Sequence, residues 1–310
     1  MTSALRRWTP EGPYDLARSL RVLPRGGLDP TCRISADTAW RACRTPDGPG
    51  TLRVTRTGAA LEGEAWGPGA QWLLARMPEL LGAQDEPAAF TPRHRLVYEA
   101  VRRHPGIRLL RTGRVLESLV PAVLEQKVTT AEAFASYRTL VRRFGEPAPG
   151  PAPRSSDGGR PVPLYVPPTP REWALIPSWE WHRANVDSKR AATVVRAARV
   201  APRLEEAAAM DLPAAMHRLQ LVPGIGPWTA AETLQRSNGF PDAVTVGDLH
   251  LPRIVGWSLA RDRGADDARM LELLSPYPGQ RHRATRYICL AGAKPPRREP
   301  KRPVGNIVGL

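Results

Sequence analysis

A short turn rich in proline and glycine, set between two helical patterns, most constrains how this chain folds. Residues 219–235 read LQLVPGIGPWTAAETLQ, with side chains at helical spacing on both sides of PGIG. Glycine permits positive φ and lets another backbone come close, so Gly224 and Gly226 predict a hairpin too tight for side chains. The second helix then begins with unpaired amides and a positive dipole end, which favour phosphate. A plain corner between two helices is the alternative.

A lone acidic residue follows this turn by about one helix. Asp248 lies within VGDLHLPR, residues 246–253, in an otherwise apolar run. We expect a helix over residues 249–259, so Asp248 would stand at its start, where a carboxylate caps the first amides. A carboxylate in a partly dry site also acts strongly on developing positive charge. An ordinary capping aspartate and a catalytic acid both suit this position.

PGIGPWTA followed by the acid of DLHLPR resembles the helix-hairpin-helix DNA glycosylases, in particular their 3-methyladenine DNA glycosylase II branch. Three further segments resemble that branch in the same order: PYDL at 13–16, ESLVPAVLEQKVTTAEA at 117–133 and NVDSKRAATVVRAAR at 185–199. The resemblance implies an α+β fold, in which a small N-terminal antiparallel sheet domain precedes a mostly α-helical domain that carries the helix-hairpin-helix motif.

The resemblance also implies an activity. It indicates a monofunctional DNA glycosylase of base excision repair, which flips an alkylated purine of the 3-methyladenine or 7-methylguanine type out of double-stranded DNA and leaves an abasic site. Asp248 would be the catalytic anion beneath the sugar. Trp228 stands where bifunctional relatives have a lysine that attacks the sugar, and it offers a stacking face to an electron-poor base instead. Two alternatives stay open: a non-catalytic DNA-binding protein that recognises lesions, and a bifunctional glycosylase and AP lyase acting on oxidised bases.

Two positions depart from the family pattern. Glu232, one turn beyond Trp228, replaces an expected aromatic residue; it either tunes the base pocket toward particular lesions or is a surface glutamate. Lys127 replaces an apolar wedge, and it either contacts a phosphate or is a solvated lysine. The predicted DNA contacts are Gly224, Gly226, Thr229, Gln126, Lys127, His250 and Arg253. The main-chain carbonyls of Gln220, Val222 and Ile225 occupy the places where family hairpins hold K⁺ or Na⁺.

Charge and cysteine content bear on partners and cofactors. Lys and Arg number 45 against 30 Asp and Glu, a net charge of +15, which indicates a polyanionic partner. Cys32, Cys43 and Cys289 are too scattered for a zinc site or for the four-cysteine iron-sulfur loop of some relatives. We therefore expect no required cofactor. The sequence contains no secretory pattern and no apolar run of membrane length, so we expect a cytoplasmic, nucleoid-associated monomer with no membrane partner.

The N-terminal domain is predicted to comprise residues 1–88. Turn residues there separate short, roughly alternating stretches, which is typical of antiparallel hairpins. The stretches are 19–24, 38–44, 51–56 and 60–66.

The helical domain is predicted to comprise residues 89–292. A Pro/Gly-rich insertion near 146–168 interrupts it, and its composition predicts an unpacked surface loop. Helices resume at Thr169, whose spacing from Glu172 matches a capping box. Residues 293–310 are predicted to be a basic flexible tail that adds nonspecific affinity for DNA.

Overall fold

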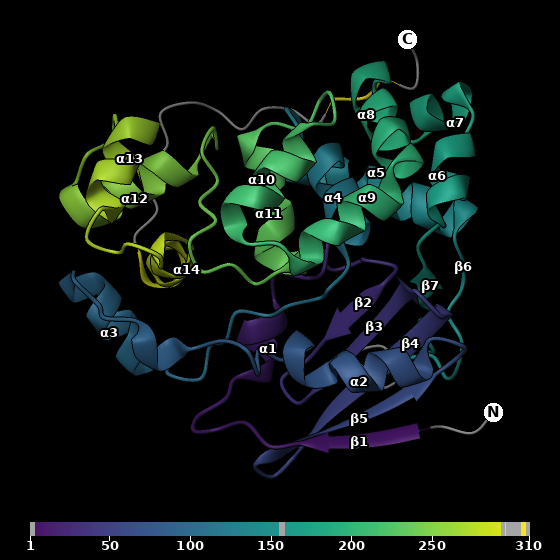
Figure 1. Cartoon of the computed structure of the whole chain (residues 1–310), viewed down its shortest axis with the longest axis horizontal. Helices are drawn as coiled ribbons and strands as arrows, with labels where there is room; N and C mark the ends of the chain where they lie inside the picture. The colour runs from purple at the N-terminus through teal and green to yellow at the C-terminus, as the bar shows by residue number, and fades with distance from the viewer. Residues whose placement is uncertain (1–3, 155–158, 293–294, 296–304, 308–310) are drawn as a thin grey trace.

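The computed structural model describes residues 4–154, 159–292, 295 and 305–307. An N-terminal sheet lies beside a larger body of helices, and the two parts are in contact along the middle of the molecule (Figure 1). The predicted α+β class is therefore confirmed. In the described residues, none of the helices combines the length and the apolar character that crossing a membrane requires.

One antiparallel sheet of five strands organises the N-terminal part. Its strands and the two helices beside them are β1 (Ala4–Trp8), β2 (Cys32–Ile34), β3 (Thr38–Thr45), β4 (Gly48–Thr57), β5 (Ala60–Trp66), α1 (Leu16–Leu20) and α2 (Ala70–Leu80). The spatial order is β1-β5-β4-β3-β2. Leu52 and Val54 of β4 alternate with outward residues and are buried beneath Met77 of α2, because side chains alternate across a strand.

The strand prediction for residues 19–24 is wrong. The Asp15 carboxylate accepts the amide of Arg18 at 2.8 Å and caps α1, so this segment ends a helix. The other three stretches form β3, β4 and β5. The strands β1 and β2 and the helix α2 were not predicted; β2 has three residues, which is too short for a periodic pattern.

The remaining helices form two groups, each around its own apolar core (Figure 1). The first group contains α4 (Val115–Leu124), α5 (Thr130–Phe144), α6 (Pro170–Leu175), α7 (Ser178–Arg183), α8 (Ser188–Arg199), α9 (Ala201–Glu205), α10 (Leu212–Gln220) and α11 (Pro227–Ser237). The second contains α3 (Arg95–Arg103), α12 (Leu251–Ala260), α13 (Asp267–Leu274) and α14 (Arg281–Ala291). Short 3₁₀ turns are η1 (Pro87–Ala89) and η2 (Glu206–Ala209). The chain passes from the first group to the second between α11 and α12, which is where Asp248 lies.

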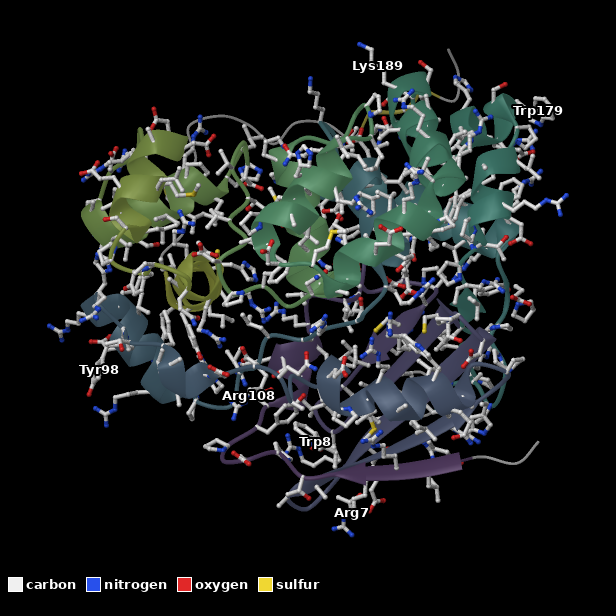
Figure 2. All side chains as sticks on the ribbon, in the orientation of Figure 1. Arg7, Trp8, Tyr98, Arg108, Trp179 and Lys189 are labelled. Atoms are coloured by element: carbon white, nitrogen blue, oxygen red, sulfur yellow. The ribbon has the colours of Figure 1, made fainter. Side chains whose placement is uncertain are left out.

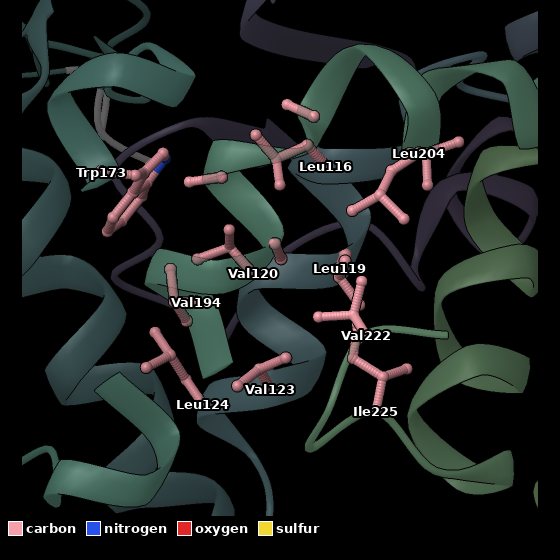
Figure 3. Packing of buried hydrophobic residues seen from close by; sticks show 14 of the residues in the cluster. Leu116, Leu119, Val120, Val123, Leu124, Trp173, Val194, Leu204, Val222 and Ile225 are labelled. Carbon is pink, nitrogen blue, oxygen red and sulfur yellow. The ribbon is translucent and has the colours of Figure 1, made fainter. Parts of the chain in front are cut away.

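The packing of the first group anchors the PGIG turn. Val222, which precedes the turn, and Ile225, which lies within it, point into the apolar cluster beside Leu119 and Val123 of α4 (Figure 3). Both side chains are buried, with 7% and 5% of their surface exposed. The turn is therefore held from below by its own apolar residues, and its glycines remain at the surface.

Helix starts follow the predicted capping chemistry. Thr169 and Glu172 form a capping box at the start of α6, as predicted, and Thr129 and Glu132 form another at the start of α5. The chain turns between α4 and α5, where Lys127 has a φ of 57°. A lysine rarely adopts this left-handed backbone, so the helix ends there.

The Pro/Gly-rich insertion differs from the expected unpacked loop. Its ends form two short paired strands, β6 (Glu146–Pro147) and β7 (Tyr165–Val166). The Val166 side chain is fully buried against Ala42 of the sheet, and the Tyr165 amide donates to the Pro30 carbonyl at 2.8 Å. Main-chain pairing and one buried valine thus attach a segment whose composition alone indicated no packing.

Most of the predicted tail, 293–310, lies outside the described residues. Its described part contacts the helical domain. The amide of Gly305 donates to Glu132, and the amide of Ile307 donates to Asn185 Oδ1 at 2.8 Å.

Buried arginines join the sheet domain to the helices. Arg41 of β3 donates to Glu117 of α4 at 2.6 Å, and Arg25 pairs with Glu125. Arg108, labelled in Figure 2, donates to the main-chain oxygens of Glu11 and Pro13. Because an unpaired buried charge is costly, these partners fix how the two parts meet.

Candidate active site

The hairpin between α10 and α11 uses its two glycines differently. Gly224 has a φ of 98°, and a Cβ built on it would stand 2.2 Å from Thr193 Oγ1 of α8. Glycine is therefore required there by the fold itself. Gly226 has an ordinary φ of −97°, and a Cβ on it would meet no atom within 4 Å. The fold leaves the space next to Gly226 open.

The start of α11 is exposed and uncapped. No side chain caps this helix, and Pro227 occupies its first turn without an amide. Gly226 and Pro227 lead into amides that, as at any helix start, lack partners within the helix. These amides and the positive end of the helix dipole together form a site that can bind an anion.

Gln126 connects the α4–α5 turn to this hairpin by hydrogen bonds. Its Nε2 donates to the Gly224 carbonyl at 2.9 Å and to Thr229 Oγ1 at 2.8 Å. The Thr229 side chain is 2% exposed, so its hydroxyl faces Gln126, and its amide is the group at the helix start. The next residue, Lys127, is exposed beside the hairpin. The hairpin and the α4–α5 turn thus form one rigid surface that carries a lysine.

The carboxylate of Asp248 is held by three donors. Its Oδ2 accepts the indole Nε1–H of Trp228 at 2.8 Å, and its Oδ1 accepts the amides of His250 at 2.7 Å and Leu251 at 2.8 Å. The helix α12 begins at Leu251 and not at Leu249 as expected, and its N-cap residue is His250. Asp248 stands two residues earlier, and its carboxylate still accepts the amide of the first helical residue, so the capping interpretation holds in this looser form. The indole bond ties the same carboxylate to the first turn of α11, directly after the hairpin. Capping and a functional role at the hairpin are therefore compatible.

Glu232 forms an ion pair with Arg236. Arg236 Nη1 donates to its Oε2 at 2.6 Å, and both side chains are largely buried, with 16% and 13% exposed. Glu232 and Glu125 raise the pKa of Arg236 even though burial acts in the opposite direction. Glu232 is thus not a free surface glutamate, and its carboxylate charge is balanced within the protein.

Helix α14 contributes three residues that the sequence analysis did not single out. His282, Arg286 and Cys289 follow one another at helical spacing, which places them on one side of α14. The negative charge of Asp248, after burial, raises the pKa of the Cys289 thiol to about 11. We call Trp228, Glu232, Asp248 and Cys289 the α11–α14 face. The i, i+4, i+7 spacing was readable in RHRATRYIC, but nothing local related it to Asp248.

The remaining predicted positions lie around this face. His250 and Arg253 are exposed at the start of α12. The carbonyls of Pro223 and Gly224 accept hydrogen bonds from Arg196 and Gln126, respectively. Of the predicted ion ligands Gln220, Val222 and Ile225, the Val222 carbonyl accepts the amide of Ile225 at 3.0 Å, and the ion site stays a prediction.

Two small, partly open pockets lie elsewhere. One of about 30 Å³ is lined by Arg25, Arg41 and Glu117 at the contact between the sheet and α4, and one of about 180 Å³ is lined by Gln84, Arg111 and other residues. Neither is lined by Asp248 or Trp228. The chemistry-bearing residues accordingly lie on the α11–α14 face and not around either pocket.

The fold that carries this glycine hairpin, the indole-bound Asp248 and the N-terminal antiparallel sheet is similar to the fold of solved DNA glycosylases. The chain is similar to the structure of the 3-methyladenine DNA glycosylase from Archaeoglobus fulgidus, with a TM-score of 0.73, 18% identity, and coverage of 92% of this chain and 97% of the other. It is also similar to the 8-oxoguanine glycosylase/lyase of Clostridium acetobutylicum, with a TM-score of 0.66, 13% identity, and coverage of 89% and 90%. The resemblance predicted from the sequence is confirmed at the level of the fold.

Two curated proteins match part of the chain. A probable bifunctional transcriptional activator/DNA repair enzyme AlkA of Mycobacterium tuberculosis is 31% identical over 49% of this chain and 29% of its own length. The DNA-3-methyladenine glycosylase of Bacillus subtilis is 25% identical over 60% of each chain. The chain thus spans less than two thirds of the curated relatives it matches. No protein-family model matches the sequence.

Proposed function

We propose that this protein is a monofunctional DNA glycosylase that removes alkylated purines from duplex DNA. The observation that carries the proposal is the Trp228–Asp248 hydrogen bond of 2.8 Å, which holds a carboxylate beside the uncapped start of α11. A phosphate seated at that helix start would bring a nucleotide's sugar close to the carboxylate. The net charge of +15 supports a polyanionic partner.

Asp248 would act on the charge that develops at the sugar. When the bond between C1′ and the base nitrogen breaks, the electron pair leaves with the base and the deoxyribose becomes positive. A carboxylate whose position is fixed by three donors stabilises that charge without having to reorganise. A water molecule then adds at C1′, and Asp248 is placed to orient it and accept its proton.

Trp228 separates this mechanism from that of a lyase. An AP lyase of this superfamily needs an amine that forms a Schiff base with the sugar. Trp228 has no nucleophilic amine, and its Nε1–H already donates to Asp248. The expected product is an intact strand with an abasic site, in contrast to the glycosylase/lyase that shares the fold.

The open side of the hairpin would bind the DNA backbone. The open space next to Gly226 would admit a phosphate, and Lys127, which is exposed and directly follows the hairpin-bound Gln126, would supply a positive charge. The main-chain carbonyls of Gln220, Val222 and Ile225 would hold a K⁺ or Na⁺ that bridges protein and phosphate. An ion there supplies positive charge and no chemistry to the reaction.

The experiment measures bases released from genomic DNA methylated with dimethyl sulfate, by mass spectrometry, for the wild type and for Asp248→Asn. We expect 3-methyladenine or 7-methylguanine to be released by the wild type, and release to fall at least about 100-fold in Asp248→Asn, because the amide lacks the negative charge. Borohydride should trap no covalent adduct. Equal rates for the two proteins would refute the role of Asp248. Binding without any release would favour a lesion-recognition protein, and a trapped adduct would favour the lyase.

A further inference from the structure

A short segment near the end of the sequence docks on the helical domain. The amide of Gly305 donates to Glu132 Oε1 in the first turn of α5, and the Gly305 carbonyl accepts Asn185 Nδ2 at 3.0 Å. The amide of Ile307 donates to Asn185 Oδ1 at 2.8 Å. The side chain of Asn185 thus binds two main-chain groups of one tripeptide. We call Gly305–Ile307 the docked segment, and Glu132 with Asn185 its docking site.

The docking site is held in place by contacts that do not involve the docked segment. Glu132 uses its other oxygen, Oε2, to accept the amide and the hydroxyl of Thr129, each at 2.6 Å, in the capping box of α5. Asn185 has a φ of 62°, a left-handed backbone that asparagine adopts more readily than most residues. Its carbonyl accepts Arg190 Nη2 at 3.2 Å. The docking site therefore does not need the segment in order to form.

The docking site and the hairpin belong to neighbouring parts of one surface. Arg190 Nη1 donates to the Leu124 carbonyl at 2.7 Å, which joins the start of α8 to the end of α4. Gln126 joins the α4–α5 turn to the hairpin. Arg196 Nε of α8 donates to the Pro223 carbonyl at 3.0 Å. The hairpin, the α4–α5 turn and the start of α8 therefore contact one another, and the docked segment lies on the last two.

Two exposed lysines border the docking site. Lys127 lies five positions before Glu132, and Lys189, labelled in Figure 2, lies four positions after Asn185. The minor groove of a duplex is only about 6 Å wide, so a duplex whose backbone meets Gly226 brings its second strand over a neighbouring part of the same surface. The two lysines would attract that strand toward the place where the docked segment lies.

Resting on the proposed function, in which the hairpin binds DNA, we propose that the docked segment is an autoinhibitory contact that DNA displaces from Glu132 and Asn185. Residues 305–310 read GNIVGL and contain no charged side chain, so the segment offers no charge to attract a phosphate. Its three hydrogen bonds replace bonds to water and are individually weak in net terms, which makes docking reversible. The protein is thus in equilibrium between a closed form and an open form, and the open form binds DNA.

Deletion of residues 305–310 tests this contact directly, because it removes no charged side chain and leaves the rest of the sequence intact. When only a fraction of the protein is competent to bind, the apparent Kd is weakened by that fraction. We expect the deletion to tighten binding of an undamaged duplex by about 3- to 10-fold, which corresponds to a closed form that predominates by a similar factor. Fluorescence anisotropy at one fixed salt concentration measures the change.

Two substitutions should reproduce the effect in the full chain. Asn185→Gly tolerates the positive φ and removes both bonds of this side chain to the segment, and it should add nothing to the deletion. Gly305→Val places a Cβ that would stand 2.7 Å from Glu132 Oε1. Gly27→Val is the matched control, because a Cβ on Gly27 meets no atom within 4 Å. Thermal unfolding checks that each variant folds.

Hydrogen exchange reports on the docked segment itself. The amides of Gly305 and Ile307 should exchange faster in the DNA complex than in the free protein. Unchanged or weaker DNA binding by the deletion variant would overturn the proposal, and so would slower exchange in the complex, which would mean that the segment stays docked on the DNA-bound protein. Base release decides the proposed function separately: if the deletion tightens binding while neither protein releases a base, the glycosylase assignment fails and the autoinhibitory contact stands.

Discussion

Gly224 and Gly226 make a matched pair whose substitution by alanine should separate folding from DNA binding. At Gly224, an alanine must adopt a φ of 98° and place its Cβ 2.2 Å from Thr193 Oγ1. The left-handed backbone costs about 1–2 kcal/mol, and the displaced threonine adds about 1–3 kcal/mol. We expect Gly224→Ala to lower Tm by about 4 to 20 °C, using roughly 2–4 °C per kcal/mol.

Gly226→Ala should leave the fold intact, since φ is −97° and the new methyl group meets no atom within 4 Å. Its free energy of unfolding should even rise, by about 0.4–1 kcal/mol, because alanine restricts the unfolded chain. The methyl group would instead occupy the space where a phosphate approaches the helix start. Loss of those charge-assisted hydrogen bonds, about 1.5–3 kcal/mol, predicts a Kd about 10- to 100-fold weaker.

The assay combines thermal unfolding with fluorescence anisotropy on a duplex containing an abasic site, at one fixed salt concentration. If Gly226→Ala binds the duplex with wild-type affinity, the proposed phosphate-binding site at the start of α11 is refuted. A loss of stability in Gly226→Ala as large as that in Gly224→Ala would refute the assignment of open space beside the hairpin. The informative result is opposite behaviour of the two variants in the two measurements.

Three further predictions concern the surroundings of the hairpin. Trp228→Phe removes one of the three donors to Asp248, so single-turnover base release should fall about tenfold or more at unchanged DNA affinity; unchanged release would mean that the indole only packs. Lys127→Ala should weaken DNA binding and reduce its salt dependence by about one phosphate contact, which a titration of Kd against salt measures. Cys289, with a pKa of about 11, should react with iodoacetamide slowly at pH 8 and faster as pH rises, and Asp248→Asn should shift that profile to lower pH; labelling at the rate of a free thiol would contradict this.

Interactions between residues close in sequence allowed several helix starts and the hairpin to be predicted from the sequence. The capping box at Thr169, the hairpin glycines and Asp248 at a helix start all depend on residues within a few positions of one another. The family resemblance added the order of the segments, and the fold agrees with it. The failure at residues 19–24 was also local, because the cap at Asp15 outweighed a weak alternating pattern.

Contacts between distant segments were decided only by the tertiary structure. The indole of Trp228 meets Asp248 twenty positions later, and Gln126 meets a hairpin 98 positions away. No periodicity encodes such pairs, since they depend on how whole helices pack. The same holds for the insertion, whose Val166 finds a place against β3 that composition does not reveal.

The sequence by itself determined which residues carry charge, where helices begin, and that an acid follows a glycine hairpin. Only the packing of whole helices brought the Trp228 indole to that acid and Gln126 to the hairpin. The physical reason is range: capping and helical spacing act over a few residues, whereas the cost of burying a charge depends on every neighbour that the folded chain brings near.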